Sequence, residues 1–331
     1  MSGIVSILTP CYNGESYVSR YLDSVLGQTY PNIELIMVND GSQDKTEEIV
    51  MSYKSKFKQR GIRFVYLFQE NKGVGAAVNH GLKYFDGDYL TWLDPDDVLP
   101  EDSISRKVEF LNQNGRYGFV RTDGNIVMEN NLSEIVGRFS DGITLHQEHI
   151  FDDLLLEKDI WIANGCYMAR RDAFLSVNPR REIYPSRAGQ NWQMLLPLAY
   201  KYKCGYIDEP LFTYVVRSGS HSHSVCGFSE QLQRCDDHKD ILEKTIDSIN
   251  MSINDKLKYY AIIEEKYLRK KFKLSLAFRE KDLIEYYFAE LKQKNLAHLK
   301  DKIDYLRRFS VINLVYTGVN RMRKYAVRHV K

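Results

Sequence analysis

The chain has 331 residues, of which 44% are hydrophobic and 27% are charged, so its composition is that of a globular protein and excludes a disordered chain. A net charge of +2 gives no general argument for nucleic-acid binding. The five cysteines include no C-x-x-C pair, which predicts reduced thiols in a cytoplasmic protein rather than disulfides or a zinc site. We find no signal-peptide pattern and no run of roughly 18 apolar residues that could span a membrane.

The first 120 residues alternate between short apolar runs, typical of buried strands, and segments with apolar residues at helical spacing. Strands are predicted at 4–10, 33–40, 62–69 and 88–94, and helices at 14–28, from 46 onward, and at 74–85. In the first helix, Val18, Tyr21, Leu22 and Val25 form the apolar face. This alternation predicts an α/β fold with a doubly wound, mostly parallel sheet of Rossmann-like type.

Polar residues follow three of the predicted strands, at 10–12, 40–42 and 94–97. In a parallel sheet, ligands bind beyond the carboxyl ends of the strands. The three segments are therefore expected to meet at one edge of the sheet and to form a single site.

Strands are also predicted at 117–123, 165–171 and 205–217, with helices at 149–157 and 190–202, and the chain is helical and charged from about Phe228. We divide the preceding part of the chain into residues 1–120 and 121–227. Residues 228–331 then form a helical C-terminal extension.

The acidic cluster in TWLDPDDVLP contains Asp94, Asp96 and Asp97. Like charges at the end of a buried strand repel one another and are costly to desolvate, so a positive partner is expected. Carboxylates spaced Asp-x-Asp can share Mg²⁺ or Mn²⁺ and leave positions open for phosphate oxygens. The alternative is a solvated loop in which Asp97 or Asp102 caps the following helix.

Asp40 ends the second strand, where its carboxylate could accept a hydrogen bond from a nucleobase while Gly41 allows close backbone approach. Tyr12 could stack on the base. The alternative is a simple turn in which Asp40 bonds its own backbone.

Three further features carry weaker signals. The segment GVGAAVNHG (73–81) lacks the full dinucleotide fingerprint, and its small residues more plausibly let a helix N-terminus approach the other loops. His221 and His223 lie in a Ser- and Gly-rich loop, where such residues are usually solvated. Trp161 and Trp192 could form a sugar-stacking wall or could simply be buried.

The C-terminus has no acidic residue after Asp304 but carries seven lysines and arginines between 305 and 331. A basic amphipathic end of this kind can lie on an anionic membrane surface, at the inner face of the cell membrane. Alternatively, it is a helix that packs its apolar face on the protein. The sequence does not choose between the two.

Residues 6–46 and 71–97, followed more faintly by segments up to about 225, resemble inverting GT-A type glycosyltransferases of family 2, including those of bacterial polysaccharide biosynthesis. The resemblance implies that residues 1–120 are the nucleotide-sugar-binding half of a catalytic domain and that residues 121–227 are its acceptor-binding half. It also implies a nucleotide-diphospho-sugar donor, with UDP as the expected nucleotide, and Mn²⁺ or Mg²⁺ as cofactor. It implies a nucleotide site that contains Pro10, Tyr12, Glu15, Asp40, Lys72, Asn79 and Asp94. By the same resemblance, Asp94 and Asp96 match the metal-binding Asp-x-Asp, and Asp97 matches a position that some members use instead.

The resemblance also implies that Arg217, Ser220 and Ser222 belong to a loop that closes over the diphosphate, and that Asp123 faces the acceptor. The sequence departs from the family at the acidic pair that provides the catalytic base, because Gln190 and Asn191 stand there. An amide cannot act as a general base. Either Asp123 takes that role, or the acceptor needs little deprotonation, or the chain transfers sugar weakly or not at all.

The expected activity is metal-dependent transfer of one sugar to a hydroxyl of a glycan or lipid-linked glycan, in a single in-line displacement. One rival is a nucleotide-sugar-binding protein without transfer, which the amides at 190 and 191 favour. A nucleotidyltransferase is a second rival, but no Gly-rich, basic phosphate loop follows the first strand.

Overall fold

The computed structural model describes residues 3–143, 147–217 and 227–307. The chain divides into two compact units, one made of Met1–Ser224 with Ile241–Lys256 and the other of Val225–Asp240 with Leu257–Lys331. The first unit contains the sheet, and the second is helical.

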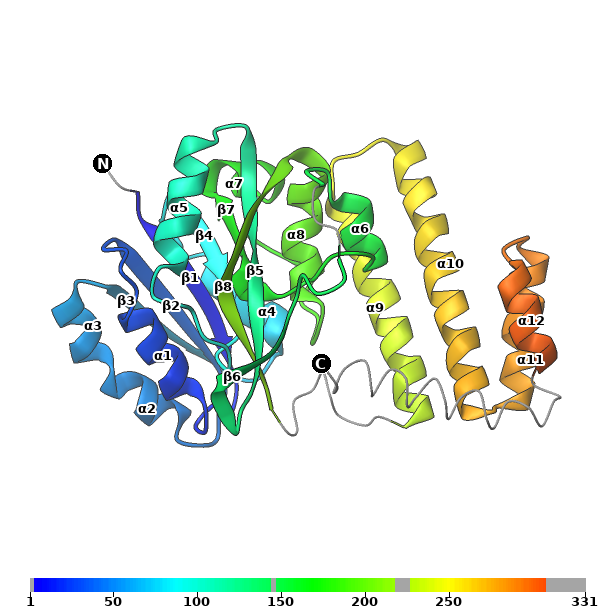
Figure 1. Cartoon of the computed structure of the whole chain (residues 1–331), viewed down its shortest axis with the longest axis horizontal. Helices are drawn as coiled ribbons and strands as arrows, with labels where there is room; N and C mark the ends of the chain where they lie inside the picture. Colours follow the sequence, from blue (N-terminus) through cyan, green and yellow to red (C-terminus); the bar gives the residue numbers. More distant parts are fainter. Residues whose placement is uncertain (1–2, 144–146, 218–226, 308–331) are drawn as a thin grey trace. The chain divides into compact units, whose positions relative to one another are not determined.

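The sheet begins with four parallel strands in the order β3-β2-β1-β4. These strands are β1 (Val5–Cys11), β2 (Ile33–Asp40), β3 (Arg63–Gln69) and β4 (Tyr89–Trp92), and the connecting helices are α1 (Val18–Leu26), α2 (Thr46–Ser52), α3 (Lys54–Arg60) and α4 (Val74–Leu82). Helices α1–α3 cover one face of these strands and α4 covers the other (Figure 1). All residues of β1 and β2 are buried as a consequence, which explains why apolar residues predominate in both strands.

The sheet continues through β7 and β5 to β6, and β8 pairs with β5. The remaining elements of this part are α5 (Ser103–Gln113), β5 (Tyr117–Met128), β6 (Asn131–Arg138), α6 (Phe151–Leu156), the 3₁₀ turn η1 (Asn164–Cys166), β7 (Tyr167–Arg170), α7 (Arg171–Val177), α8 (Gln190–Lys201) and β8 (Lys203–Val216). Strand β7 is antiparallel to both β4 and β5, so β5 runs in the same direction as β4. The carboxyl end of β5 therefore lies at the same edge as those of β1, β2 and β4.

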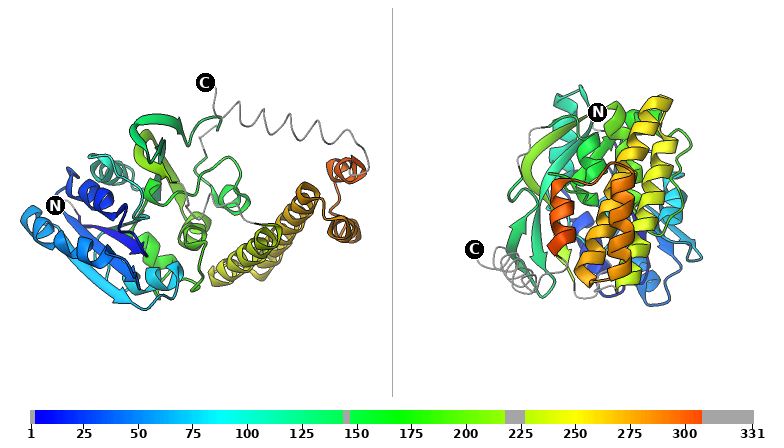
Figure 2. Two further views of the ribbon diagram at one scale, coloured as in Figure 1. Left: turned by 90° about the horizontal axis from the view of Figure 1, so that it is seen from below. Right: turned by 90° about the vertical axis from the view of Figure 1, so that its right-hand side faces the viewer.

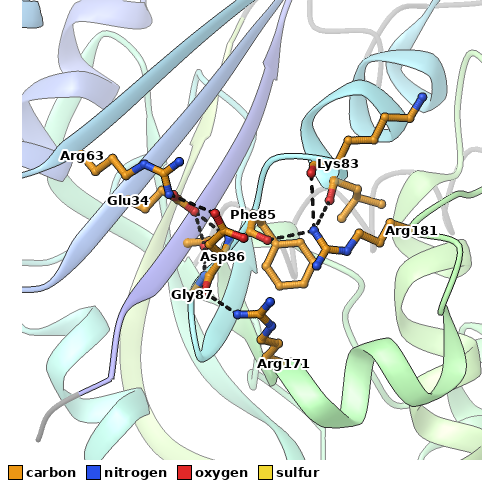
Figure 3. A network of polar contacts seen from close by, with 10 residues as sticks. Glu34, Arg63, Lys83, Phe85, Asp86, Gly87, Arg171 and Arg181 are labelled. Atoms are coloured by element: carbon orange, nitrogen blue, oxygen red, sulfur yellow. Dashed lines mark hydrogen bonds and ion pairs between the residues drawn. The ribbon is translucent and has the colours of Figure 1, made fainter.

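The connection between α4 and β4 is held by charged residues from distant segments (Figure 3). The Arg181 guanidinium donates to the carbonyl of Phe85 at 3.0 Å and lies 4.7 Å from the Phe85 ring centroid. Arg171 donates to the carbonyl of Asp86 at 2.7 Å, and the buried Glu34 accepts from the Asp86 backbone N–H while pairing with Arg63. These contacts fix the start of β4, and hence the position of the acidic segment at its other end.

The helices of the C-terminal part are α9 (Phe228–Ser248), α10 (Ile253–Phe278), α11 (Lys281–Gln293) and α12 (Leu299–Arg307). In the helical unit, Leu268, Phe272, Ile284, Phe288 and Leu291 form a buried core between α10 and α11. Figure 2 shows these helices from two further sides, with α12 in orange-red beside α11. Among the described residues, no helix has the length and apolar character needed to cross a membrane.

The predicted α/β fold with a mostly parallel sheet and a helical C-terminal part is confirmed, including the four apolar residues of α1 as its buried face. Strand β6 and the short helix α7 were not predicted, and the helix predicted from 46 onward is divided into α2 and α3. Every residue of β6 but one is exposed, so the strand has no alternation of buried and exposed residues that a sequence pattern could reveal. Trp161 and Trp192 are both buried.

Candidate functional site

The loops after β1 and β2 are joined by reciprocal hydrogen bonds. The Asn13 backbone N–H donates to Ser42 Oγ at 2.9 Å, and the Gln43 N–H donates to Asn13 Oδ1 at 2.9 Å. Two residues further along each loop, Glu15 Oε2 accepts a hydrogen bond from the Lys45 N–H at 2.9 Å. These bonds bring the segment after the first strand against the segment after the second, as the parallel-sheet rule predicts.

Between these loops, Tyr12 is the exposed aromatic residue, with 45% of its surface accessible, whereas Pro10 is buried within β1. An exposed ring beside polar loops is available to stack on a flat ligand. Glu15 uses one carboxylate oxygen on the Lys45 backbone, so its role in this conformation is to hold the two loops together.

The Asp40 carboxylate is buried and accepts three hydrogen bonds, from Gln69 Nε2 at 2.7 Å and from the backbone N–H groups of Lys72 at 3.0 Å and Gly73 at 2.9 Å. Gly41 makes this possible, because it has φ 74° and a Cβ there would lie 2.6 Å from the backbone nitrogen of Asn71. Asp40 is therefore more than a local turn: it ties the end of β2 to the segment that begins α4. One lone pair of Oδ2 is left for a further donor.

Helix α4 is in turn packed against residues 183–187. Asn79 bonds both the N–H and the carbonyl of Ile183, at 2.7 and 2.8 Å, and the Gly75 N–H donates to the carbonyl of Ser186 at 2.9 Å. A Cβ on Gly75 would lie 2.7 Å from the Ser186 nitrogen, so the small residues do permit this approach. Asn79, expected near the base or ribose, is used here to hold the backbone at Ile183.

Arg187 is a residue that sequence reasoning missed. Its side chain lies against Gly73, and its guanidinium donates to Asn71 Oδ1 at 3.2 Å. It therefore lies beside the segment that binds Asp40, although it is more than 100 residues away in the chain. A single arginine in an irregular segment carries no local sequence signal for such a contact.

The acidic segment is bonded to the end of β8. Val98 and Thr213 exchange two backbone hydrogen bonds of 3.1 and 2.9 Å, and the Val215 N–H donates to Asp97 Oδ1 at 3.0 Å. Asp97 is buried, and burial together with the charges of Asp96 and Asp94 raises its pKa. In this conformation Asp97 supports the backbone of β8.

The same contact delivers Arg217, the residue after β8, to Asp96. Arg217 Nε and a terminal guanidinium nitrogen both donate to Asp96 Oδ2, at 3.0 and 2.7 Å. The guanidinium also lies 4.0 Å from the centroid of the Tyr17 ring, and Arg20 donates to the carbonyl of Asp96 at 2.8 Å. The positive partner that the acidic cluster requires is therefore an arginine of the chain itself.

Within the described part of the chain, no basic residue pairs with Asp94. Burial and the neighbouring charge of Asp96 raise its pKa to about 7, although a hydrogen bond from the Asn164 side chain favours the charged form. Asn164, in η1, is a second residue that sequence reasoning missed. The fully buried Lys107 holds the same turn by donating to the carbonyl of Gly165 at 2.5 Å, and burial lowers its pKa to about 8.

Asn191 lies at the same edge of the sheet. Its Oδ1 accepts from Trp92 Nε1 at 3.3 Å, and its Nδ2 donates to the carbonyl of Ile162 at 3.3 Å. Gln190 precedes it as the first residue of α8 and is partly exposed. The amide of Asn191 thus uses both a donor and an acceptor, next to the strand that ends at the acidic segment.

Asp123, the expected acceptor-side carboxylate, is buried in β5. Its Oδ1 accepts from the N–H groups of Gly124 at 2.7 Å and Ser140 at 3.1 Å, and its Oδ2 accepts from Ser140 Oγ at 2.7 Å. Asp123 lies two residues beyond Arg121, which pairs with Tyr167 at the start of β7. The predicted residues Ser220, His221, Ser222 and His223 and the segment after Arg307 lie outside the described residues.

The residues present fit a divalent cation. No group of three or more His, Cys, Asp and Glu side chains that could hold a metal is found within 3–143, 147–217 and 227–307. Two carboxylates nevertheless suffice for Mg²⁺ or Mn²⁺ when phosphate and water complete the shell. Burial, and then the neighbouring charge of Asp96, raise the pKa of Asp94, and a cation between the two carboxylates would favour its charged form.

The family model described as glycosyl transferase family 2 matches residues 6–176, which is 171 of the 331 residues. The chain belongs to glycosyl transferase family 2. The uncharacterized glycosyltransferase RT0329 of Rickettsia typhi is 45% identical over 112 residues, which make up 34% of this chain and 33% of that protein. The minor teichoic acid biosynthesis protein GgaB of Bacillus subtilis is 39% identical over 110 residues, 33% of this chain and 12% of that protein. The chain thus spans a third or less of the length of these relatives.

Two solved structures share the fold. S. aureus TarS 1-349 in complex with UDP-GlcNAc has a TM-score of 0.56 at 15% identity, covering 92% of this chain and 79% of that one. The mannosyltransferase PcManGT from Pyrobaculum calidifontis, in complex with GDP-Man and Mn²⁺, has a TM-score of 0.58 at 15% identity, covering 99% and 86%. The expected GT-A type fold is confirmed by these similarities.

The raised pKa of Asp94 predicts that its carboxylate destabilises the metal-free protein. The pKa of Asp94 in the folded protein, about 7, lies above its ordinary value of 3.8. The free energy of unfolding therefore decreases as the pH rises from about 4 through 7, because the buried group loses its proton over that range. In EDTA at pH 8, Asp94→Asn should therefore increase the free energy of unfolding in urea by roughly 1–3 kcal/mol. At pH 5 the gain should be much smaller. Asp102→Asn, an equivalent change at an exposed position, is the control, and a variant that is less stable than wild type at both pH values would refute the prediction.

Proposed function

We propose that the chain transfers a sugar from a nucleoside-diphosphate sugar, with UDP as the expected nucleotide, to a hydroxyl of a glycan or lipid-linked glycan. The reaction is an inverting single displacement. The observation that carries the proposal is the convergence of the Asp40 carboxylate, the Asp94–Asp96 pair and Arg217 at one edge of the sheet. The family membership and the fold shared with a UDP-GlcNAc complex support this choice.

The nucleotide is expected to lie across the joined loops of β1 and β2. Tyr12 would stack on the base, and Asp40 Oδ2 would accept a hydrogen bond from it. Asp94 and Asp96 would hold Mn²⁺ or Mg²⁺, which when bound offsets the charge of the diphosphate. Arg217 already lies on Asp96, within reach of the same region, and would stabilise the negative charge that develops on the leaving diphosphate.

In this proposal Asp123 is the general base that removes the proton from the acceptor hydroxyl, because neither Gln190 nor Asn191 carries a carboxylate. Asp123 belongs to β5, which runs in the same direction as β4. Among the described residues, its Oδ2 accepts a hydrogen bond from the Ser140 hydroxyl, which leaves a lone pair for a proton. Asn191 keeps its place beside Trp92 and helps to shape the acceptor side. The acceptor class is supported by the relative named for minor teichoic acid biosynthesis.

Donor binding is the first test. Calorimetric titration of the protein with UDP, GDP, dTDP and CMP in Mn²⁺ should show one preferred nucleoside diphosphate, and EDTA should abolish most of that affinity. Asp96→Ala should reproduce the effect of EDTA in the presence of Mn²⁺ and should reduce sugar transfer by orders of magnitude without unfolding the protein. If the folded wild type binds none of these nucleotides, the transferase proposal is wrong.

Arg187 should contribute to nucleotide affinity because its guanidinium lies beside the segment that binds Asp40. Arg187→Ala should weaken UDP binding about tenfold or more, which is the usual loss for a hydrogen bond to a charged group. A contact with the nucleotide predicts the same loss for UDP and for UDP-sugar. The exposed Arg180 lies in the same connection between α7 and α8 as Arg187. Arg180→Ala is therefore the matched control. Equal affinities for both variants and wild type would remove Arg187 from the site.

Asp123→Asn tests the catalytic base. An asparagine can keep the two backbone N–H bonds on its oxygen and donate to Ser140 Oγ, so the fold should survive. Removal of the base should lower the rate constant of transfer by about 10²–10⁴-fold while leaving donor affinity unchanged. Wild-type turnover in this variant would eliminate Asp123 as base. Donor binding without turnover by the wild type, across a panel of glycan acceptors, would instead favour the nucleotide-sugar-binding protein that the amides at 190 and 191 suggest.

A further inference from the structure

Helix α12 exposes an apolar stripe on the helical unit. Leu299, Ile303 and Leu306 have 73%, 39% and 65% of their surface accessible. Their spacing of four and three residues puts them on one side of the helix. Single exposed apolar residues are common on protein surfaces, but three in one helical stripe indicate an interaction surface for a protein or a membrane.

The opposite side of α12 is fixed to the rest of the unit. Asp301 is buried and pairs with Arg269 of α10, and the Tyr305 ring stacks on Phe288 of α11 with 4.0 Å between centroids. Because this inner side supplies the contacts that orient the helix, the stripe of leucine and isoleucine is not a face awaiting the core of its own unit.

Lysines border the stripe. Lys300 and Lys302 are exposed and lie on either side of it, whereas the acidic residues Asp301 and Asp304 lie toward the other half of the helix circumference. Long lysine side chains can extend past an apolar layer and keep their charges in the polar layer above it. An apolar stripe between lysines is the arrangement that lies in the interface of an anionic bilayer.

The charge of the following sequence is of the same sign. From Tyr305 to Lys331 the chain has seven lysines and arginines and no acidic residue. Basic residues next to an interfacial helix add attraction to negatively charged lipids. Charge complementarity therefore favours a lipid surface over a second copy of this chain, which would present the same positive charge.

We propose that the outer face of α12, defined by Leu299, Ile303 and Leu306 between Lys300 and Lys302, is a docking surface for an anionic membrane. The three apolar side chains insert among the lipids, and the two lysines contact their headgroups. The proposal goes beyond the transferase function and does not depend on it, since it concerns only the helical unit and the lipid.

The test is sedimentation of the full-length protein with vesicles of phosphatidylcholine containing phosphatidylglycerol, and with vesicles of phosphatidylcholine alone. Wild type should bind the anionic vesicles, and binding should fall with salt and be weak without phosphatidylglycerol. The triple variant Leu299→Ser, Ile303→Ser, Leu306→Ser should bind at least tenfold more weakly. Lys300→Gln with Lys302→Gln should lower binding to anionic vesicles with no effect on the neutral ones.

A second triple variant is the control, Leu132→Ser, Ile135→Ser, Val136→Ser, because these β6 side chains are also exposed, at 44%, 54% and 49%. It should bind vesicles as wild type does, and both triple variants should keep the wild-type midpoint of thermal unfolding. Equal binding by wild type and the α12 variant, or no binding by wild type, would overturn the proposal. Loss of a wild-type dimer in the α12 variant, with vesicle binding unchanged, would assign the stripe to self-association instead.

Discussion

The constraint on which the candidate site depends is the repulsion among carboxylates at the ends of buried strands. Asp94, Asp96 and Asp97 are placed side by side by the backbone after β4, where water is partly excluded and their charges are screened less than in solution. The three carboxylates are stabilised differently by the described residues: Asp97 accepts a hydrogen bond from a backbone N–H, Asp96 from an arginine, and Asp94 from a neutral amide. The proposed cation would stabilise the charged form of Asp94.

The second half of the sheet supplies that partial compensation. Strand β8 pairs with β5, and its end exchanges hydrogen bonds with the acidic segment through Thr213 and Val98, which leads the chain directly to Arg217. Both nitrogens of Arg217 use the same oxygen of Asp96, so the other oxygen remains for a metal ligand bond. In the proposed donor complex, the arginine that stabilises the acidic cluster would thus also lie close to the diphosphate.

The sequence predicted those parts of the site that follow from local pattern and from the parallel-sheet rule. Tyr12, Asp40 and the acidic segment each follow an apolar run, so their meeting at one edge was foreseeable. Arg187 and Asn164 were not, because each reaches the site through packing against a residue far away in the chain, Gly73 and Asp94 respectively. The buried Lys107 was equally hidden, since a lysine in an amphipathic helix ordinarily predicts an exposed side chain.

The contacts of Asn191 explain why this chain has an amide where the family usually has an acidic residue. Its side chain accepts from Trp92 Nε1 and donates to the carbonyl of Ile162. An aspartate could keep the first bond, but it would place a negatively charged oxygen against the Ile162 carbonyl, and two acceptors repel. The segment before η1 is therefore arranged for an amide at this position. In the proposed reaction the general base would therefore come from another element, and the buried Asp123 of β5 is the carboxylate proposed for that role.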